Sequence, residues 1–527
     1  MTRPPDPADT IAAAVAATGC SVAFGVPGGG PNLDLVGALD YHGVRFVLAH
    51  SEAASCIMAS AYGHLTGSVS AAVVTRGPGA TAAVNGVAQA TLDRHPLLVV
   101  TDTVPHAQRA RIAHQRLDQR ALMRPITKAS WRVGSTEADV DGLLAIAAAE
   151  PPGAVHIDYD GAAITVAYEP EVPIVAPPPV TQEALGHVAR YVAHSQRPIV
   201  IVGRGGLASG SALQAELEAF GAPVLVTYQA SGTIPSEHPL CGGHFTNGAA
   251  ERPLIDEADL IVLVGFDPVE PIPAEWPTEV PVVSLAATRT TDAYAPITAE
   301  LVGDPATLLA QLLATGAVRH TWSAGVGAFH RRRLRQRLSE GEAEFGPVEL
   351  VTTAARHTPT HAITTVDAGA HFLAIMPFWP IRNPGQLLIS NGLATMGYAV
   401  PAAIGAALAR PGTPVVALVG DGGLAMTQAE LETIARLDLP ITIVVFNDGA
   451  LSLIEIKQRP GQGGNAAVRY GDTDFAAIAD AHGVAGTVAH SIADVEKVLT
   501  ERRDRPRLID ARIDPAPYPH LMQVTRG

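Results

Sequence analysis

Short apolar runs alternate with amphipathic stretches along the chain, a pattern typical of α/β proteins whose parallel sheets are covered by helices. The runs that predict buried strands are 21–24, 45–48, 69–74, 97–101, 198–202, 222–227, 260–264, 362–366, 387–390, 415–419 and 441–446. The stretches that predict helices include 9–18, 33–39, 53–65, a segment ending at Ala90, 401–409 and a single helix between the last two strands. The sequence therefore predicts a doubly wound α/β fold.

The pattern divides into three units. We expect a first domain over residues 1–168, a Rossmann-like middle domain over 180–318 and a last domain over 346–527, with the first and last of similar architecture. A proline-rich segment at 169–179 is typical of a linker. A charged helical stretch at about 320–345 connects the second and third units, and we expect its basic cluster, 330–337, to be a solvated helix face.

Composition narrows the class of protein. The chain is 47% hydrophobic and 17% charged, with 50 Gly and 42 Pro, as in a globular protein rich in turns. The net charge of −15 argues against broad nucleic-acid binding. Cys20, Cys56 and Cys241 form no CxxC pair, which indicates a reducing compartment. Because we find neither a long apolar span nor a signal-peptide core at the start, we expect a cytoplasmic protein with no membrane partner.

Two neighbouring predicted strands each end in a turn with carboxylates and glycines. One strand is followed by GDGG at 420–423 and the next by NDG at 447–449. Ligands of open α/β sheets bind at the carboxyl ends of strands, and a helix N-terminus favours phosphate. Asp421 and Asp448 supply the hard oxygens that Mg²⁺ prefers. Either turn alone is an ordinary loop signal, but together they predict a Mg²⁺–diphosphate site.

The spacing of the two turns resembles that of the thiamine-diphosphate (ThDP) enzymes, whose signature is GDG followed about two dozen residues later by NN or a variant. Here 24 residues, 423–446, lie between Gly422 and Asn447, and Asp448 replaces the second Asn. The resemblance implies that Asp421, Asp448 and the backbone carbonyl of Ala450 hold Mg²⁺. The cofactor contacts that it implies at this end are Gly422, Gly423, Asn447, Asp448, Ala450, Leu451 and Leu453.

Glu52 follows a predicted strand and begins an apolar helix that Ser51 would cap. The residues alone allow two interpretations: a carboxylate favoured by the helix dipole, or one in an apolar crevice that shares a proton with a ring nitrogen. ThDP enzymes carry a Glu at this point, in a string similar to SEAAS at 51–55. The resemblance implies that Glu52 binds the aminopyrimidine ring and promotes loss of the thiazolium C2 proton.

Other motifs extend the resemblance through both outer domains. The FGVPGG string at 24–29 would place Pro27, Gly28 and Gly29 at the cofactor, and RGPGAT at 76–81 would place Pro78 beside the pyrimidine. Gln115 precedes RPITK at 124–128, at a point where relatives carry an active-site Gln. Without the family, it would be an ordinary polar residue.

The GLATMGY string at 392–398 resembles a segment of acetolactate synthases. There the Met, here Met396, bends the cofactor, and the carbonyl two residues earlier, here that of Ala394, accepts from its 4′-amino group. The residues alone also allow Met396 to be a core residue that fills a gap.

The middle domain carries GRGGLA at 203–208 after a strand, a weak dinucleotide signal because no acidic residue ends the next strand. Some relatives bind FAD, ADP or CoA in this domain. The flavin motif of acetolactate synthases, similar to GARFDDR, is replaced by GFDPVE at 265–270, and the usual DIDP is replaced near 284–287. We therefore expect that the middle domain does not bind FAD, and FAD binding stays open as the alternative.

The resemblance implies an enzyme of the acetolactate synthase, pyruvate oxidase and benzoylformate decarboxylase group. We expect ThDP- and Mg²⁺-dependent decarboxylation of a 2-oxo acid, followed by carboligation or aldehyde release. A non-decarboxylating lyase, a 2-hydroxyacyl-CoA lyase and a ThDP-binding protein without turnover stay open. The family shares each active site between chains, which implies a homodimer at minimum and usually a homotetramer. The residues alone allow Lys457 to be either a substrate ligand or a surface residue. Glu455 and Lys457 together make the substrate of the pocket hard to name.

Overall fold

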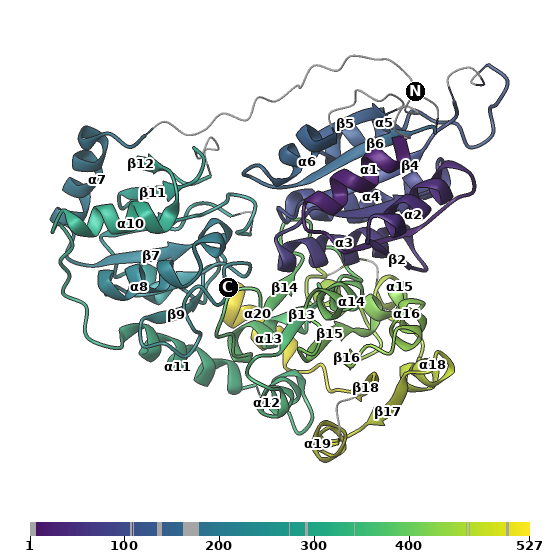
Figure 1. Ribbon diagram of the computed structural model, residues 1–527. Helices are drawn as coiled ribbons and strands as arrows, with labels where there is room; N and C mark the ends of the chain where they lie inside the picture. The colour runs from purple at the N-terminus through teal and green to yellow at the C-terminus, as the bar shows by residue number, and fades with distance from the viewer. Residues whose placement is uncertain are drawn as a thin grey trace.

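The chain folds around three parallel sheets of six strands each. Figure 1 shows the computed structural model, in which each sheet has its own covering helices. The structure describes residues 7–105, 108, 110–133, 140–161, 179–272, 274–289, 294–341, 343–459, 461–462, 464–501 and 505–527. The predicted α/β class with three parallel-sheet domains is confirmed.

The first sheet has the strand order β2-β1-β3-β4-β6-β5. Its strands are β1 (Val22–Val26), β2 (Arg45–Leu48), β3 (Ser70–Val74), β4 (Leu97–Asp102), β5 (Ala129–Val133) and β6 (Ala154–Tyr159). Its helices are α1 (Pro7–Ala17), α2 (Pro31–Tyr41), α3 (Glu52–Thr66), α4 (Pro78–Leu92), α5 (Gln119–Met123), the 3₁₀ helix η2 (Arg124–Ile126) and α6 (Val140–Ala148).

The third sheet, β14-β13-β15-β16-β18-β17, repeats the order of the first when strands are numbered within each domain. Its strands are β13 (Ile363–Val366), β14 (Leu387–Ile389), β15 (Val415–Gly420), β16 (Ile441–Asn447), β17 (Ala485–Ala489) and β18 (Arg507–Arg512). Its helices are α12 (Pro347–His357), α13 (Phe372–Phe378), α14 (Ala399–Ala409), α15 (Asp421–Thr427), α16 (Glu430–Arg436), α17 (Ser452–Glu455), η4 (Asn465–Ala467), α18 (Phe475–Ala481), α19 (Ile492–Thr500) and α20 (Tyr518–Arg526). The similar architecture expected for the two outer domains is confirmed.

The middle sheet, β12-β11-β10-β7-β8-β9, has the Rossmann order of strands. Its strands are β7 (Pro198–Val202), β8 (Val224–Val226), β9 (Cys241–His244), β10 (Leu260–Val264), β11 (Val282–Ala286) and β12 (Ile297–Val302). Its helices are α7 (Gln182–His194), η3 (Arg204–Ser209), α8 (Gly210–Phe220), α9 (Arg252–Ile255) and α10 (Pro305–Ala314), and α11 (Val326–Ser339) leads to the third domain.

Two sequence-based expectations need correction, and a third concerns residues that the structure does not describe. The single helix expected between β15 and β16 is two helices, α15 and α16, and the GDGG residues after Gly420 are the first turn of α15 rather than a loop. The basic cluster on α11 is not wholly solvated, because Arg335 donates to the Pro377 carbonyl at 2.7 Å and Arg331 donates to the Cys241 carbonyl. All of the expected linker at 169–179 except its last residue lies outside the described residues.

The two outer domains share one apolar core, because α3 and α4 of the first domain pack on each other and α3 packs on α14 of the third. This packing requires small residues at the contact. A Cβ at Gly405 in α14 would overlap the Met58 carbonyl oxygen, and one at Gly86 in α4 would lie 2.5 Å from the Ala53 carbonyl oxygen. The position of the third domain relative to α3 and α4 is therefore closely determined.

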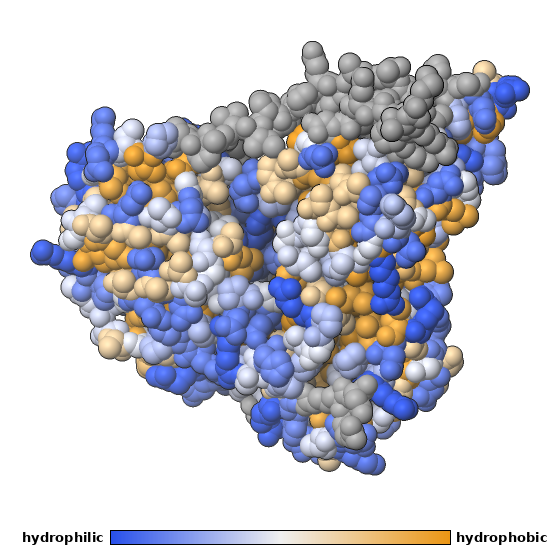
Figure 2. Space-filling view, in the orientation of Figure 1, coloured by the Kyte–Doolittle hydropathy of each residue, from blue (hydrophilic) through white to orange (hydrophobic). Residues whose placement is uncertain are grey.

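Some large apolar side chains of the outer domains remain exposed. Tyr41 of α2 is 83% exposed, Met426 of α15 is 60% exposed and Leu48 of β2 is 49% exposed. These elements lie on the right-hand side of Figure 1, where Figure 2 shows many hydrophobic residues at the surface. We call these three residues the apolar face. Among the described residues, no helix has the length and apolar character that a membrane crossing needs, and all three cysteines are buried free thiols.

We predict that Gly405→Ala lowers the free energy of unfolding by about 1–3 kcal/mol, because the added methyl group forces α14 away from α3. Urea unfolding followed by circular dichroism measures the change. Gly37→Ala is the matched control, since Gly37 is also inside a helix, α2, but has open space around it. Equal effects of the two substitutions would contradict the close α3–α14 contact.

Candidate active site

Asp421 and Asp448 lie at the carboxyl ends of adjacent strands, β15 and β16. Both carboxylates accept the backbone N–H of Ala450, at 3.1 Å from Oδ2 of Asp421 and 3.2 Å from Oδ1 of Asp448. The described residues hold no group of three or more His, Cys, Asp or Glu side chains placed for a metal. Two carboxylates with few other side chains suit Mg²⁺, which takes its remaining ligands from phosphate and water.

The acid pair lies in a poorly solvated turn. Burial, with the charge of Asp448 as the next cause, raises the pKa of Asp421 to about 7. Burial also raises the pKa of Asp448, whose Oδ2 accepts the Ser452 hydroxyl at 2.6 Å. Since two buried carboxylates repel each other when both are ionised, a divalent cation between them would be favourable. The residues present therefore fit a hard cation.

Met396, Leu451 and Tyr470 converge on Gly422 in the first turn of α15. A Cβ at Gly422 would lie 3.1 Å from Leu451 Cδ2 and from the Tyr470 hydroxyl, and 3.3 Å from Met396 Cε. Glycine thus keeps a space open between these side chains. The sequence analysis named Met396 and Leu451, whereas Tyr470 lies in a segment without a motif.

Ala394 has a φ of 53°, a left-handed conformation that alanine rarely adopts. The neighbouring Thr395 fixes this backbone, because its hydroxyl donates to Asn85 Oδ1 of α4 at 2.7 Å and its N–H donates to the Ser390 hydroxyl. Backbone strain of this kind is often found at functional sites. It supports the prediction that the Ala394 carbonyl is presented to a ligand.

Two buried residues at the end of β13 were missed by the sequence analysis. Asp367 accepts the N–H groups of Gly397 and Ala399 at 2.9 and 3.1 Å, and burial raises its pKa to about 7. His371 stacks on Phe446 beside Gly420, and burial lowers its pKa to about 4. Among the described residues, its buried Nε2 has no hydrogen-bond partner. The string DAGAH after a strand was the signal that could have found them.

The first domain brings Glu52 and Gln115 to the loop-to-helix junction at 77–79, where Gly77 precedes α4. Glu52 begins α3, and the Ser51 hydroxyl accepts the Ala54 N–H, which confirms the predicted cap. Glu52 Oε1 lies 3.3 Å from the position of a Cβ on Gly79. Gln115, with a φ of 55°, packs on Gly77, where a Cβ would lie 2.9 Å from Gln115 Cβ.

A second glutamine, which the sequence analysis missed, holds this junction. Gln119 is buried, and its Oε1 accepts the Gly77 N–H at 2.8 Å. Its Nε2 donates to Asp158 Oδ1 and Thr101 Oγ1 at 2.8 and 3.0 Å. Pro78 is the first residue of α4. Proline suits this position because it has no N–H, and a backbone N–H there would have no partner within the helix.

The 27–30 loop lies against the end of β3, because a Cβ at Gly28 would overlap Thr75 Oγ1. The Gly28 N–H donates to Asn32 Oδ1 at 2.7 Å, which orders the start of α2. The loops that carry Pro27, Gly28, Gly29 and Pro78 are therefore at the same carboxyl edge of the first sheet as Glu52.

A cavity of about 770 Å³ borders Gln115 and Gln119 in the first domain. Its cationic lining residues are Arg76, Arg116, Arg120, Arg124, Lys128 and Arg132. Asp118 and Asp158 are the acidic residues of the lining. Arg76 is paired with Asp102 at 3.1 Å, so part of this charge is compensated. The cavity nevertheless has a net positive lining in a chain whose net charge is −15.

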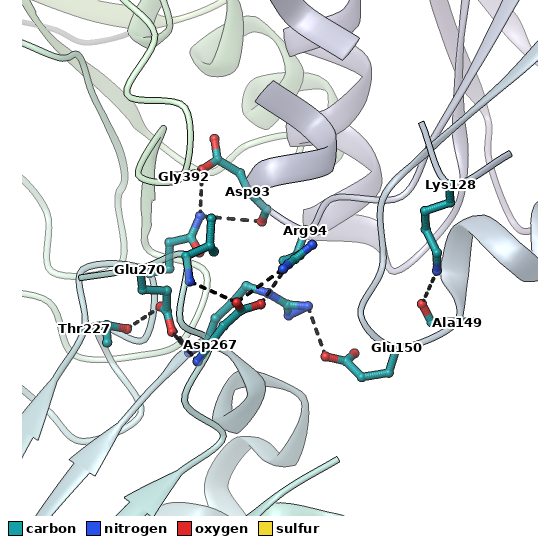
Figure 3. A network of polar contacts seen from close by, with 12 residues as sticks. Asp93, Arg94, Lys128, Ala149, Glu150, Thr227, Asp267, Glu270 and Gly392 are labelled. Carbon is teal, nitrogen blue, oxygen red and sulfur yellow. Dashed lines mark hydrogen bonds and ion pairs between the residues drawn. The ribbon is translucent and has the colours of Figure 1, made fainter. Parts of the chain in front are cut away.

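The three domains meet at Asp93, directly after α4 (Figure 3). Its buried Oδ1 accepts the N–H groups of Asn391 and Gly392 from the third domain at 2.9 and 2.6 Å, and the Gln229 amide from the middle domain at 3.1 Å. Burial raises the pKa of Asp93 to about 6. Arg94 pairs with Asp267 at 2.7 Å, which adds a second link to the middle domain.

Other predicted positions have structural partners. The Asn447 amide donates to Asp510 Oδ1 and to the Thr473 carbonyl at 2.8 and 3.2 Å, so its contact with a diphosphate stays a prediction. Glu455 pairs with Arg469 at 2.7 Å, whereas Lys457 is exposed. Within the described residues, no hydrogen bond or ion pair joins Glu52 to the Asp421 turn.

Comparisons with known proteins identify the family of the chain. Three family models match the chain: "Thiamine pyrophosphate enzyme, N-terminal TPP binding domain" at residues 6–122, "central domain" at 185–312 and "C-terminal TPP binding domain" at 367–511. The chain belongs to the thiamine-diphosphate-dependent enzymes.

Within that family the chain is acetolactate synthase-like. It is 30% identical over 536 residues to the acetolactate synthase of Bacillus subtilis (strain 168), which covers 94% of this chain and 91% of that protein. It is 30% identical over 533 residues to the acetolactate synthase large subunit of Lactococcus lactis subsp. lactis (strain IL1403), covering 94% and 90%. It is 29% identical over 558 residues to the acetolactate synthase isozyme 3 large subunit of Escherichia coli (strain K12), covering 97% and 95%.

We predict that Ala394→Gly raises the free energy of unfolding of the cofactor-free protein by up to about 1 kcal/mol, because glycine adopts a positive φ without strain. The same change should weaken ThDP binding, since the carbonyl is no longer held in one direction. Urea unfolding and a ThDP titration of intrinsic fluorescence measure the two effects. Ala402→Gly, inside α14, is the control and should destabilise the protein.

Proposed function

We propose that the chain catalyses the ThDP- and Mg²⁺-dependent decarboxylation of a 2-oxo acid, followed by carboligation to a second carbonyl or by aldehyde release. The observation that carries the proposal is the convergence of Met396, Leu451 and Gly422 beside the Asp421–Asp448 pair. The printed names of the relatives, acetolactate synthases, support a carboligase and make pyruvate the first donor to test. When bound, ThDP supplies the carbon nucleophile and the electron sink for this chemistry.

The third domain would bind the diphosphate end of the cofactor. Asp421, Asp448 and the Ala450 carbonyl would hold Mg²⁺, and the N-terminal turn of α15 at Gly422 and Gly423 would face the diphosphate. His371 lies beside Gly420 through its Nδ1 and Cε1 atoms, and its buried Nε2, which has no hydrogen-bond partner among the described residues, supports a polar ligand at the far edge of the ring. Leu451 and Leu453 would keep water from the adjoining pocket.

The first domain would bind the aminopyrimidine end of the cofactor. Glu52 would hold a proton shared with the aminopyrimidine N1′, and the 77–79 junction would support that ring. The cationic cavity next to Gln115 supports an anionic substrate, because a 2-oxo acid brings a carboxylate. Gln115 would then donate a hydrogen bond to the substrate rather than transfer a proton.

We infer that a second copy of the chain completes each site. The apolar face, Tyr41, Leu48 and Met426, spans the first and third domains next to the elements that carry Glu52 and Asp421. A symmetric pair that buries this face would place the first domain of one chain against the third domain of the other. A homodimer is then the minimum assembly, and a homotetramer is compatible with it.

We predict that Glu52→Gln lowers kcat by about 10²–10⁴-fold, because the variant cannot exchange a proton with the cofactor ring. ThDP and Mg²⁺ binding, followed by thermal shift, should change little. Glu183→Gln is the matched control, since Glu183 also lies in the first turn of a helix and is exposed, so a role limited to the helix dipole predicts equal effects. Full turnover by Glu52→Gln would refute the proposed proton transfer.

A panel of 2-oxo acids, aldehydes and 2-hydroxyacyl-CoA compounds, incubated with ThDP and Mg²⁺, tests the reaction class. We expect CO₂ release from a 2-oxo acid and a C–C coupled product or an aldehyde by mass spectrometry. EDTA should abolish the reaction, and Mg²⁺ should restore it. Aldehyde formation from a 2-hydroxyacyl-CoA without CO₂ would favour the lyase alternative, and ThDP binding without any turnover would favour the non-catalytic one.

Mixing two inactive variants tests whether the sites are shared. Glu52→Gln and Asp421→Ala should each be inactive, but subunit exchange between them should restore about one quarter of the wild-type activity, because half of the dimers are mixed and each of these has one intact site. Activity is measured before and after exchange under mild denaturation. A mixture that stays inactive, while a labelled-chain assay shows that exchange has occurred, would mean that each chain carries its own complete site.

A further inference from the structure

We propose that Glu270 is an internal anion of the middle domain: its carboxylate fills the crevice in which a Rossmann-type sheet receives the phosphate of a dinucleotide or nucleotide. The middle domain then takes neither FAD nor ADP nor CoA at that crevice. The filled crevice instead supports the loop that leads to Ala394 and Met396. Figure 3 shows Glu270 with Thr227 and Asp267 at this place.

Glu270 occupies the expected ligand position of the fold. In a doubly wound sheet, ligands bind beyond the carboxyl ends of the strands where the strand order reverses, which here is between β7 and β10. Glu270 comes from the loop after β10, and its Oε2 accepts the Arg204 N–H after β7 at 3.0 Å. Oε1 accepts the Thr227 hydroxyl after β8 at 2.5 Å. The carboxylate therefore uses donors from the ends of the central strands.

The donors that it uses are those that a phosphate needs. Backbone N–H groups of a glycine-rich loop bind phosphate in dinucleotide folds. Here the Arg204 N–H and the Asp267 N–H, the latter at 3.2 Å from Oε2, both donate to Glu270. The carboxylate is buried, with 6% of the residue exposed. A phosphate would have to displace a satisfied, buried group.

The crevice is also closed by backbone contacts. The Gly205 N–H donates to the Gly265 carbonyl at 2.8 Å, so the loops after β7 and β10 touch. A Cβ at Gly203 would lie 2.7 Å from Glu270 Oε2 and would overlap Phe266 Cα. Gly205 and Gly206 lie within the 3₁₀ helix η3, and α8 begins only at Gly210, so the glycine-rich segment does not lead directly into the N-terminus of α8.

The cations near the crevice are already paired with carboxylates, Arg94 with Asp267 at 2.7 Å and Arg204 with Glu150 at 3.5 Å. Asp267 lies at the same loop, and Glu270 adds a second carboxylate. The flavin motif is altered at this point of the sequence, and the hydrogen bonds of Glu270 show what the altered residues do instead. The donors that would face a pyrophosphate are already hydrogen-bonded to the Glu270 carboxylate, so the residues present do not fit FAD at this crevice.

The filled crevice has a second role. The Glu270 carbonyl accepts the Asn391 side-chain amide at 2.6 Å, and Asn391 precedes Gly392, whose N–H is held by Asp93. The middle domain and α4 thus hold the start of the 391–396 loop from two sides. This arrangement makes the middle domain a support for the candidate active site.

Ligand binding to the intact wild-type protein is the first test. We expect no flavin absorbance in the purified protein, and no binding of FAD, ADP or CoA at micromolar concentration by calorimetry. ThDP with Mg²⁺ is the positive control for a competent preparation. Micromolar binding of FAD, ADP or CoA would overturn the proposal.

Chemical rescue is the second test and needs no turnover. Glu270→Ala should lower Tm by several degrees, because the Arg204 and Asp267 N–H groups and the Thr227 hydroxyl lose their acceptor. Formate should restore part of this loss in the variant, while chloride at equal ionic strength should not. Glu275→Ala is the matched control, since Glu275 is an exposed carboxylate of the same segment and should not respond.

If Glu270→Ala does not fold, Glu270→Gln replaces it. The amide keeps the side-chain volume and one acceptor oxygen, so this variant should fold with a smaller loss of Tm and no response to formate. A Glu270→Ala variant that is as stable as the wild type, or a stabilisation by formate equal to that of Glu275→Ala, would overturn the role of Glu270 as an internal anion.

Discussion

The carboxylate of Asp93 determines how the three domains fit together. It lies directly after α4 and accepts two backbone N–H groups of the third domain and one amide of the middle domain. Because it is buried, its loss would leave these donors without an acceptor in a poorly solvated junction. The position of Gly392, and with it the loop that carries Ala394 and Met396, therefore depends on one side chain of the first domain. Close packing of α3 on α14 then limits the remaining freedom.

The outer domains have the same strand order but opposite electrostatics at their carboxyl edges. The edge of the third sheet carries Asp421 and Asp448, which suit a cation that is bound with a phosphate group. The edge of the first sheet carries Glu52, and the first domain also has a cavity with a cationic lining next to Gln115, which suits an anionic substrate. A duplicated architecture thus offers two different half-sites, and the difference lies in the loops after the strands rather than in the sheets.

The sequence predicted eleven of the eighteen described strands, each a short apolar run between turn residues, and missed β5, β6, β9, β11, β12, β17 and β18. The strands at 45–48, 198–202 and 260–264 have the predicted bounds. The division between α15 and α16 was missed, because no Gly or Pro marks it. Candidate residues such as Asp421 and Glu52 could be proposed from the sequence because they lie within contiguous motifs. Asp93, Gln119 and Asp367 were not proposed, because each acts on a backbone segment far along the chain or outside any motif, and only the folded structure brings that segment near.

Buried and half-buried carboxylates have two distinct uses in this chain, and a donor shared between two adjacent carboxylates marks the second use. Asp93, Asp367 and Glu270 each accept two or more backbone N–H groups from irregular segments, so their oxygens are committed to holding loops. Asp421 and Asp448 instead share the Ala450 N–H; Asp421 also accepts the Gly422 N–H at 2.7 Å, and Asp448 also accepts the Ser452 hydroxyl at 2.6 Å. Burial raises the pKa of all five carboxyl groups, so a raised pKa alone does not identify a ligand site. The adjacency of two carboxylates at the ends of β15 and β16, which share one N–H donor, is what sets the Asp421–Asp448 pair apart as a place for a cation.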